Sequence, residues 1–563
     1  MSSSSMQHVL ACCIIVIVAW TFHAGSLDGW WSIDDPALLR TTIQHGVFYQ
    51  FFDPVTWRAH YPAAPVPGIF TPWINATLAM DIWIFGLEPI FFYGHQLLSL
   101  SLVGIIAYLF LVRYLSGVYA FSAILLFLWT APVDAVAYHL QTRHYLEGLG
   151  FTLCSMLLFS HAIVSKSYKS SMTKAIIGAF IYLLATSAKE IYAPLPGALL
   201  LLPGVTIRRA WRHLLPYGLM AILYAIWRAY MLGAQGMFHA YGDLLWFDWT
   251  YIIRFLAAAP RHLKLDDSFR QIVALLSLLP LLLRCCIKKS YDMWRVLGWV
   301  ALLALPLYRV LDFSAPWYFF APMLPLCAWI LRNAQELWAS GWVWKWCMII
   351  WLPLTLIGNA WACWHWPALG ATQEQARYRE EGQFVLYVGT PGKVLVYPAD
   401  RWWHYYESLA WLRRQVMHGG KGPAVCYDLR FCPPLQGGWQ AYRYIPATAS
   451  VRQVKEEVLP PRVCASGVAD VLHGTMQYSI GAYGVGSLQW RIKPFLKNRE
   501  RYHLVMANDH EDVFGFDIPI PAAGSFPFNL HQRLSFFVRY EGNGCVLESP
   551  LLALQPYPSS VSW

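Results

Sequence analysis

The sequence predicts an α-helical polytopic membrane protein with about eleven transmembrane helices, followed by a C-terminal exported region of the α/β plus β-sandwich type. Of the 563 residues, 57% are hydrophobic and 13% are charged, whereas a soluble domain carries about 25% charged residues. The hydrophobic residues come in blocks of roughly 20, which is enough to cross a ~30 Å hydrocarbon core. In the last third of the chain, alternating patterns broken by Gly, Pro and Asn replace these blocks.

The hydrophobic blocks define the expected spans. Residues 7–24 lack the basic n-region and the cleavage context of a signal peptide, so we expect them to form the first transmembrane helix. The full set of expected spans is 7–24, 89–112, 117–134, 145–164, 173–189, 190–206, 213–232, 271–288, 294–311, 314–331 and 342–363.

Basic residues set the expected orientation. With the N-terminus inside, the spans place short basic loops on the inner side, as the positive-inside rule requires. The inner residues are Arg113, Lys166, Lys169, Lys174, Arg208, Arg209, Arg212, Arg284, Lys288, Lys289, Arg295 and Arg332. The outer side receives residues 25–88, 233–270 and everything after about 364. The formal charge of +10 is therefore a feature of topology. The sequence has no RRM, zinc-knuckle or helix-turn-helix pattern, so no nucleic-acid partner is expected.

The chain changes character from residue 367. The segments "GKVLVYPAD" and "GPAVCYDL" predict strands around a helix at "RWWHYYESLAWLRRQV", and alternation in "SLQWRIKP", "RYHLVMA" and "RLSFFVRYEG" predicts an antiparallel sandwich. We therefore expect a transmembrane domain over 1–366, a small exported α/β domain over 367–470 and a sandwich-like domain over 471–563. An even number of cysteines in this region permits two disulfides of undetermined pairing, among Cys426, Cys432, Cys464 and Cys545.

Ionisable residues gather at the expected outer ends of the helices and not at the bilayer centre, where one charge costs ~2.5–3.5 kcal/mol. In "DAVAYHLQTRHYLEG", His139, Arg143 and Glu147 are spaced four apart and are expected to share a helix face. The other members of the outer set are Asp34, Asp35, Asp53, Arg58, His60, Lys189, Glu190, Arg254, Arg261, His262, Lys264, Asp266 and Asp267. Such a mixed acidic and basic rim suits a reaction on a lipid-borne anionic substrate.

Four segments, in this order, resemble the GT-C superfamily of membrane glycosyltransferases, especially its protein O-mannosyltransferase-like branch and the related transmembrane proteins with TPR repeats. They are "WSIDDPALL", "FTPWINATLAMDIWIFGLEPIFFYGHQLLSL", "VAYHLQTRHYLEGLGFTL" and "ATSAKEIYAPLPGALLL". The resemblance covers roughly residues 1–335. The chain departs from the family because no TPR array follows, and because Thr71 stands where related sequences often have an arginine.

The resemblance implies that a sugar moves from a polyprenyl-phosphate carrier to an acceptor hydroxyl, with a first-loop carboxylate as general base. The implied base is Asp34 or Asp35, with Asp34 preferred as the first acid of the pair. The implied ligands of the donor phosphate are Arg143, Lys189 and Arg58. Further site candidates are Glu190, His60, Glu147 and Arg261.

The residues alone also allow simpler interpretations. The "DDP" sequence is typical of a helix start, Asp53 before Pro54 is typical of a turn or cap, and Lys189–Glu190 is compatible with an interfacial ion pair. The aromatic "RWWHYYE" segment fits either a sugar-stacking surface or a packed core. No HExxH or CxxC pattern predicts a zinc site, so we assign no metal ligand, although a divalent metal is compatible with the expected chemistry.

The expected partners are a polyprenyl-phosphate sugar donor, a glycan, lipid or protein acceptor, and membrane lipids. We expect an integral protein of a bacterial inner membrane, with the active site and C-terminal region facing the periplasm. Two other functions stay open. A glycan polymerase or ligase that uses lipid-diphosphate oligosaccharides predicts a large outer loop late in the membrane domain. A lipid or solute transporter predicts charges at the bilayer midplane and two related halves.

Overall fold

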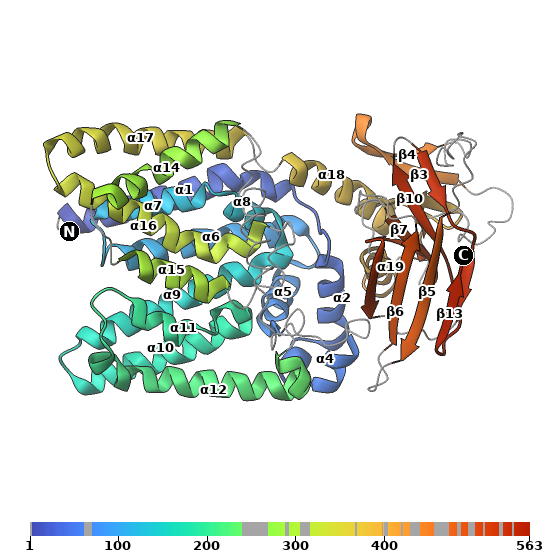
Figure 1. Cartoon of the computed structure of the whole chain (residues 1–563), viewed down its shortest axis with the longest axis horizontal. Coiled ribbons are helices and arrows are strands. Elements are labelled where there is room, and N and C mark those ends of the chain that lie inside the picture. Colours follow the sequence, from blue (N-terminus) through green and yellow to red (C-terminus); the bar gives the residue numbers. More distant parts are fainter. Residues whose placement is uncertain are drawn as a thin grey trace. The chain divides into compact units, whose positions relative to one another are not determined.

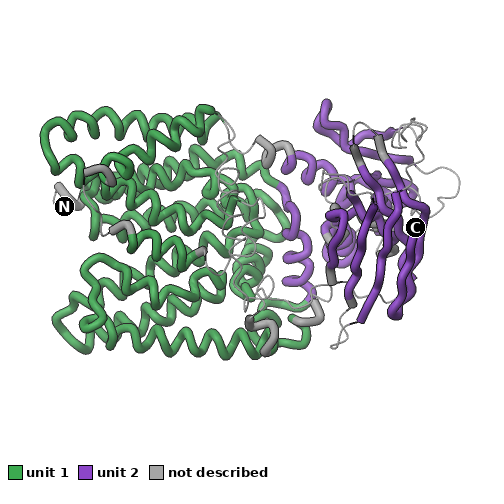
Figure 2. Tube along the Cα trace, viewed as in Figure 1, with its two compact units in different colours: residues 1–29, 45–57, 66–372 green, residues 30–44, 58–65, 373–563 purple. Residues whose placement is uncertain are grey.

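The computed structural model divides into two compact units, which Figure 2 shows in two colours. Unit 1 comprises residues 1–29, 45–57 and 66–372, and unit 2 comprises residues 30–44, 58–65 and 373–563. The diacidic segment, Asp34–Asp35, therefore belongs to the same unit as the C-terminal region. The residues that the structure describes are 3–60, 70–238, 268–287, 292–304, 316–365, 369–396, 398, 403–417, 420–427, 440–454, 472–480, 486–493, 502–510, 513–527, 533–542 and 545–563.

Unit 1 is a helical bundle (Figure 1). Its first helices are α1 (Ser3–His23), η1 (Ala24–Asp28), α3 (Tyr49–Phe52), α4 (Pro54–His60), α5 (Pro72–Phe85), α6 (Pro89–Leu111), α7 (Gly117–Leu128), α8 (Ala131–Tyr138), η2 (Leu140–Thr142) and α9 (Arg143–Val164). The later ones are α10 (Tyr168–Ala188), η3 (Glu190–Tyr192), α11 (Leu195–Ala198), η4 (Leu199–Leu201), α12 (Ile207–Phe238), α14 (Ser268–Ile287), α15 (Asp292–Ala304), η6 (Pro316–Phe319), α16 (Phe320–Ala339) and α17 (Trp342–His365). Helix α18 (Leu369–Gln383) begins in unit 1 and ends in unit 2.

Six stretches among the described residues are long and apolar enough to cross a membrane. They are Met6–Asp28, Pro89–Leu111, Leu140–Val164, Tyr168–Ala188, Ile207–Gly233 and Trp342–His365. The pair α7 and α8 adds a seventh if the two helices form one bent span. These helices support an integral membrane protein. The expected count of about eleven is not confirmed and stays a prediction, since α14 and α15 border residues outside the described part.

Two expected spans are broken, and proline explains both breaks. In place of one straight helix over 190–206, the chain forms the short turns η3, α11 and η4 along a segment with three prolines. The expected span over 117–134 bends by 58° between α7 and α8, where Pro132 lies in the first turn of α8. A proline inside a helix removes a backbone donor and clashes with the preceding turn, so a regular helix does not continue through it.

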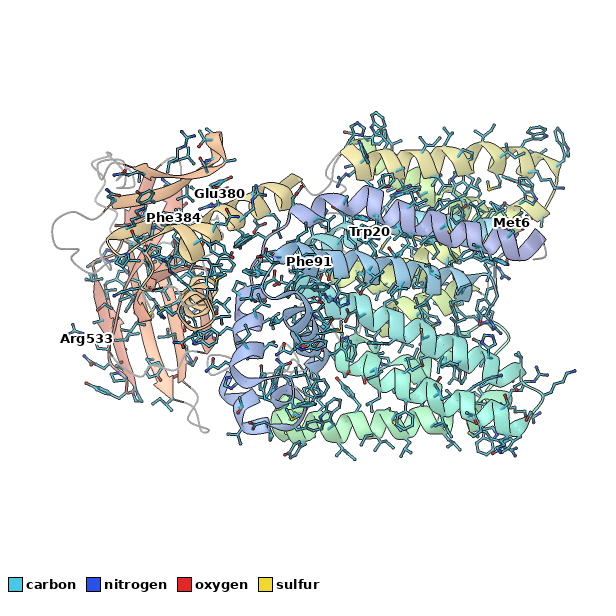
Figure 3. All side chains as sticks on the ribbon, turned by 180° about the vertical axis from the view of Figure 1, so that it is seen from behind. Met6, Trp20, Phe91, Glu380, Phe384 and Arg533 are labelled. Carbon is cyan, nitrogen blue, oxygen red and sulfur yellow. The ribbon has the colours of Figure 1, made fainter. Side chains whose placement is uncertain are left out.

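Helix α5 buries polar side chains and exposes apolar ones. Asn75 and Asp81 are fully buried, whereas Trp83 is 85% exposed. Met6 on α1 and Phe91 on α6, both labelled in Figure 3, are exposed apolar side chains as well. An apolar exterior around a polar interior is what a helix needs when its outer face contacts lipid. The polar face of α5 therefore lies inside the protein and its apolar face outside.

A close contact fixes the start of η3 against α9. A Cβ atom on Gly148 would lie 2.4 Å from the Tyr192 ring, so only glycine permits this approach. The Tyr192 hydroxyl donates a hydrogen bond to the Tyr145 carbonyl oxygen at 2.5 Å. This contact places Lys189 and Glu190, three and two residues before Tyr192, beside the first turns of α9.

Unit 2 combines short helices with two sheets. The helices are α2 (Asp35–His45), whose last residue belongs to unit 1, η7 (Phe384–Val388), α19 (Trp403–Gln415) and η9 (Pro446–Thr448). The strands are β1 (Lys393–Val396), β2 (Ala424–Cys426), β3 (Gln440–Ile445), β4 (Ser450–Val454), β5 (His473–Ile480), β6 (Gly486–Lys493), β7 (Tyr502–His510), β8 (Val513–Ile520), β9 (Ala523–Pro527), β10 (Leu534–Gly542), β11 (Cys545–Glu548), β12 (Leu552–Leu554) and β13 (Ser559–Ser562).

The larger sheet has nine strands in the order β11-β10-β7-β8-β2-β1-β3-β4, with β12 also paired to β10. Strands β1 and β2 are parallel, with Val394 opposite Ala424, and α19 connects them. This is the strand–helix–strand unit that the sequence predicts. Because the sheet takes strands from both 367–470 and 471–563, the two segments share one sheet, and their division into two domains stays a prediction.

The smaller sheet, of order β13-β5-β6-β9, shares one apolar core with the larger sheet. Met476 and Leu488 from the smaller sheet and Leu504 and Phe536 from the larger are fully buried in this core. Cys426, at the end of β2, is disulfide-bonded. The side chains of the other three candidate cysteines lie outside the described part of the chain.

Candidate functional site

The two carboxylates of the diacidic segment lie in different surroundings. Asp35 is buried, and its Oδ2 accepts a hydrogen bond from the Ser32 backbone N–H at 2.8 Å. The Asp35 backbone N–H donates in return to the Ser32 carbonyl oxygen at 2.9 Å. These two bonds close the turn that precedes α2, and the Asp35 carboxylate satisfies a backbone N–H of that turn. Asp34 is exposed, and its carbonyl oxygen accepts the first helical bond, from the Leu38 N–H at 3.0 Å.

Ile33, directly before Asp34, has a strained backbone. Its φ angle is +48°, a left-handed conformation that is an outlier for a β-branched residue. Strain of this kind costs of order 1–3 kcal/mol, persists only where the surroundings impose it, and is concentrated at active sites and ligand clamps. Here the bonds between Ser32 and Asp35 hold both ends of the strained turn.

Helices α18 and α19 hold the segment before this turn. The Gln375 Oε1 accepts a hydrogen bond from the Trp30 backbone N–H at 2.9 Å, and the Gln375 Nε2 donates to the Ser32 hydroxyl at 3.3 Å. The Tyr405 hydroxyl donates to the Trp31 carbonyl oxygen at 2.9 Å. The diacidic segment is thus anchored by the C-terminal region, to which its sequence position gives no link.

Helix α19 also binds α2 directly. The Arg40 guanidinium donates to the buried Glu407 carboxylate at 2.7 Å. Tyr405 and Tyr406 of the aromatic "RWWHYYE" segment are fully buried, and the Tyr406 hydroxyl donates to Glu381 Oε2 at 2.5 Å. These two tyrosines therefore pack in the core of unit 2, which is the simpler of the two interpretations that their sequence allowed.

In unit 1, Arg143 is fully buried in a polar network. Its guanidinium forms an ion pair with Asp81 and donates to the Phe92 carbonyl oxygen at 2.6 Å and to Gln96 Oε1 at 3.1 Å. A donor phosphate would have to displace the Asp81 carboxylate to reach this cation. The geometry favours a positioning role for Arg143, and direct phosphate binding stays a prediction.

His95 joins two carboxylates of the same network. Its Nδ1 lies 2.7 Å from Asp81 Oδ1, and its Nε2 lies 3.5 Å from Glu147 Oε1. Glu147 also accepts hydrogen bonds from the Trp73 indole N–H at 2.6 Å and from the Thr77 hydroxyl at 3.1 Å. These contacts tie α5 and α6 to the first turns of α9.

The predicted pair of Lys189 and Glu190 is formed and buried. The Lys189 Nζ lies 3.1 Å from Glu190 Oε1 and 5.1 Å from the centre of the Tyr145 ring. Within the described part of the chain, neither carboxylate oxygen of Glu190 accepts a hydrogen bond, so Lys189 balances its charge. Arg228, also buried, donates to the Tyr224 hydroxyl at 3.5 Å, and the charges of Arg228, Lys189 and Glu190 all act on that phenol.

Three other predicted site residues cannot be placed. The side chains of Arg58 and His60, and the whole of Arg261 with the basic stretch around it, lie outside the described part of the chain. His139 differs from expectation because it precedes α9 in extended conformation and so does not share a face with Arg143 and Glu147.

Asp53 is a helix cap. Its carboxylate accepts hydrogen bonds from the Val55 N–H at 3.0 Å, the Thr56 N–H at 3.1 Å and the Thr56 hydroxyl at 2.5 Å. The bonds from Thr56, led by the hydroxyl, lower the pKa of Asp53 below its ordinary value. Among the residues that the structure describes, no cluster of three His, Cys, Asp or Glu side chains is arranged to hold a metal ion, and a divalent metal stays a prediction.

No protein-family model and no curated protein matches the sequence. Among solved structures, ArnT from Cupriavidus metallidurans bound to undecaprenyl phosphate matches with a TM-score of 0.42 and 11% identity, over 78% of this chain and 88% of ArnT. The apo form of ArnT gives the same TM-score at 12% identity. Arabinosyltransferase EmbB from Mycobacterium smegmatis matches with a TM-score of 0.34 and 12% identity, over 98% of this chain and 61% of EmbB. At these TM-scores the likeness assigns this chain no donor, acceptor or residue role.

The sequence did not single out several residues that organise these groups. Asp81 is a lone acid within an apolar helix, and His95 lies in a quoted motif, so both carried a usable signal. Gln375 and Glu407 carried no signal in the sequence for their contacts, because their partners are more than 300 residues away in the chain.

Proposed function

We propose that this chain is a membrane glycosyltransferase that moves a sugar from a polyprenyl-phosphate carrier to an acceptor hydroxyl, with Asp34 as the general base. The observation that carries the proposal is the difference between the two acids. Asp35 is buried and holds the helix start, whereas Asp34 is exposed and follows a strained residue. A general base must come within hydrogen-bond reach of the proton that it removes, and Asp34 has the accessibility that this requires.

The chemical step needs one base and one stabilised leaving group. The Asp34 carboxylate takes the proton of the acceptor hydroxyl, and the hydroxyl oxygen forms a bond to the anomeric carbon. The bond between that carbon and the phosphate oxygen breaks, and polyprenyl phosphate leaves with the electron pair. Because the leaving group is an anion, cations at the site lower the barrier by stabilising its developing charge.

Lys189 is the best described candidate for that cation. It is buried beside Glu190, and both Lys189 and Arg228 lie close enough to the Tyr224 phenol for their charges to act on it. A phosphate that reached these two cations would have its developing charge stabilised by them. Arg143 supports the site by holding α5, α6 and α9 together through Asp81.

The disulfide at Cys426 supports a periplasmic C-terminal region, because disulfides persist in oxidising compartments and are rare in the cytosol. The apolar helices place the protein in a membrane. A polyprenyl-phosphate donor carried in that membrane would meet an acceptor on the exported side.

The test uses the full chain in lipid nanodiscs, a panel of synthetic undecaprenyl-phosphate sugars and an extract of the host envelope as the source of acceptor. We expect one of the undecaprenyl-phosphate sugars to be consumed and undecaprenyl phosphate to be released. The Lys189→Gln variant should raise the donor KM about tenfold or more, whereas Lys189→Arg keeps the charge and should recover part of the loss. Lys169→Gln, an exposed lysine of the predicted inner side, is the control.

Two outcomes contradict the proposal. A transporter would move the donor across the bilayer and leave it chemically intact. A polymerase or ligase would consume lipid-diphosphate oligosaccharides and leave the monophosphate sugars unused.

A further inference from the structure

Unit 1 contains an apolar cavity among α6, α9, η4, α15 and α16. Its volume of about 980 Å³ includes the open space at its mouth. Leu153 and Met156 of α9 and Leu303 of α15 line its walls, together with Leu324 of α16. Neither Lys189 nor the Arg143 network lines it.

Two arginines line the cavity, and both belong to the predicted inner side. They are Arg295 at the start of α15 and Arg332 near the end of α16. Arg332 donates to Glu336 Oε1 at 3.0 Å and to the Tyr114 carbonyl oxygen at 2.9 Å, and Arg284 donates to Glu336 Oε2 at 2.8 Å. Arg284 and Arg332 thus share the single carboxylate of Glu336, so these three side chains carry a net charge of +1, since 2 minus 1 is 1.

A further hydrogen-bond donor lines the same cavity. The Trp329 indole N–H is buried and has no hydrogen-bond partner among the described residues. A buried donor without an acceptor costs about 1–3 kcal/mol. An ester carbonyl or phosphate oxygen in the cavity would satisfy it.

We propose that this cavity binds one anionic phospholipid of the inner leaflet. An acyl chain lies along the apolar walls, and the phosphate lies at Arg295 and Arg332. Basic pockets between transmembrane helices on the cytoplasmic side are suited to anionic headgroups. A zwitterionic lipid offers the same chains without the net charge, so the arginine end distinguishes the two. The proposal does not depend on sugar transfer by the rest of the protein.

The experiment is native mass spectrometry of the full-length protein released from nanodiscs that hold equal amounts of phosphatidylglycerol and phosphatidylcholine. We expect one retained phosphatidylglycerol, with a preference over phosphatidylcholine that falls about fivefold in Arg295→Gln, as the loss of one arginine near anionic lipid implies. Ala328→Trp places an indole in the cavity and should abolish retention of both lipids. Arg212→Gln, an exposed arginine of the same predicted side, should retain the wild-type preference.

Three results would overturn the proposal. The first is an unchanged preference for phosphatidylglycerol in Arg295→Gln. This variant remains informative even if Ala328→Trp fails to fold, because Arg295 is only half-buried and its substitution should leave the fold intact. The second is equal loss in Arg295→Gln and Arg212→Gln, which would indicate general attraction to the surface. The third is displacement of the phospholipid by undecaprenyl phosphate added to the nanodiscs, which would make the cavity a carrier site.

Discussion

Asparagine substitutions at Asp34 and Asp35 should separate catalysis from structure. Asp34→Asn removes a carboxylate that is exposed and leaves the Ser32–Asp35 bonds intact. Asp35→Asn removes the charge from a buried carboxylate that accepts the Ser32 N–H at 2.8 Å. The two changes are chemically identical and adjacent in sequence, so each is the matched control of the other.

The two variants should change different properties. Asp34→Asn should mainly lower the rate of transfer, and Asp35→Asn should mainly lower the stability of α2. Loss of a general base lowers the rate about 10²–10⁴-fold, so Asp34→Asn should reduce transfer by that factor and change stability by no more than about 0.5 kcal/mol. A hydrogen bond to a charged group is worth about 1 kcal/mol more than one to a neutral group. Asp35→Asn should therefore destabilise the start of α2 by about 1 kcal/mol and reduce transfer less than tenfold, because Asp34 remains.

Two measurements on the same preparations check this. Release of undecaprenyl phosphate reports transfer, and hydrogen exchange of the backbone amides over residues 32–44 reports the stability of α2. If Asp35→Asn loses transfer at least as strongly as Asp34→Asn while α2 stays protected, the roles of the two acids are reversed. If both variants keep full transfer, the first outer loop supplies no base.

Three other perturbations test the supporting contacts. Arg143→Ala leaves a buried Asp81 carboxylate without its main cation and should cost roughly 3–5 kcal/mol in thermal unfolding; Asp81→Asn in the same chain should restore much of that stability, and a transfer defect that persists would favour direct phosphate contact by Arg143. Gly382→Ala would put a Cβ atom 2.3 Å from the Trp30 indole nitrogen, so transfer should fall with no change of charge, while Gly420→Ala, with no neighbour within 4 Å, should not alter the rate. Because the pKa of Asp53 is lowered, its cap contributes stability above the ordinary carboxyl pKa and loses it only as the pH falls through the lowered value. Hydrogen exchange of the α4 amides should therefore accelerate only in acid. In Asp53→Asn, exchange should already be faster at neutral pH and should change little as the pH falls.

The sequence was sufficient for the long helices because length and apolarity are local properties. The expected spans 89–112 and 145–164 match α6 (Pro89–Leu111) and α9 (Arg143–Val164) to within two residues. It was insufficient for 190–206, where three prolines turn an apolar block into short helical turns. All three segments are rich in apolar residues, and the three prolines distinguish 190–206 from the other two.

The candidate site shows the same limit at longer range. Adjacent residues such as Lys189 and Glu190 could be paired from the sequence, and they are paired. The bond from Trp30 to Gln375 joins residues 345 positions apart. No periodicity or motif predicts such a contact, since it depends on the tertiary packing of α18 and α19 beside the diacidic segment.

The strain at Ile33 connects these observations. A β-branched residue at φ +48° holds that conformation only if its neighbours leave no relaxed alternative. The neighbouring chain is fixed by Gln375 and Tyr405, both from the C-terminal region. The energy that maintains the strained turn before Asp34 therefore comes in part from residues after 367. On this argument the C-terminal region is a structural part of the diacidic site, and an acceptor-binding role for its sheets would be an additional function.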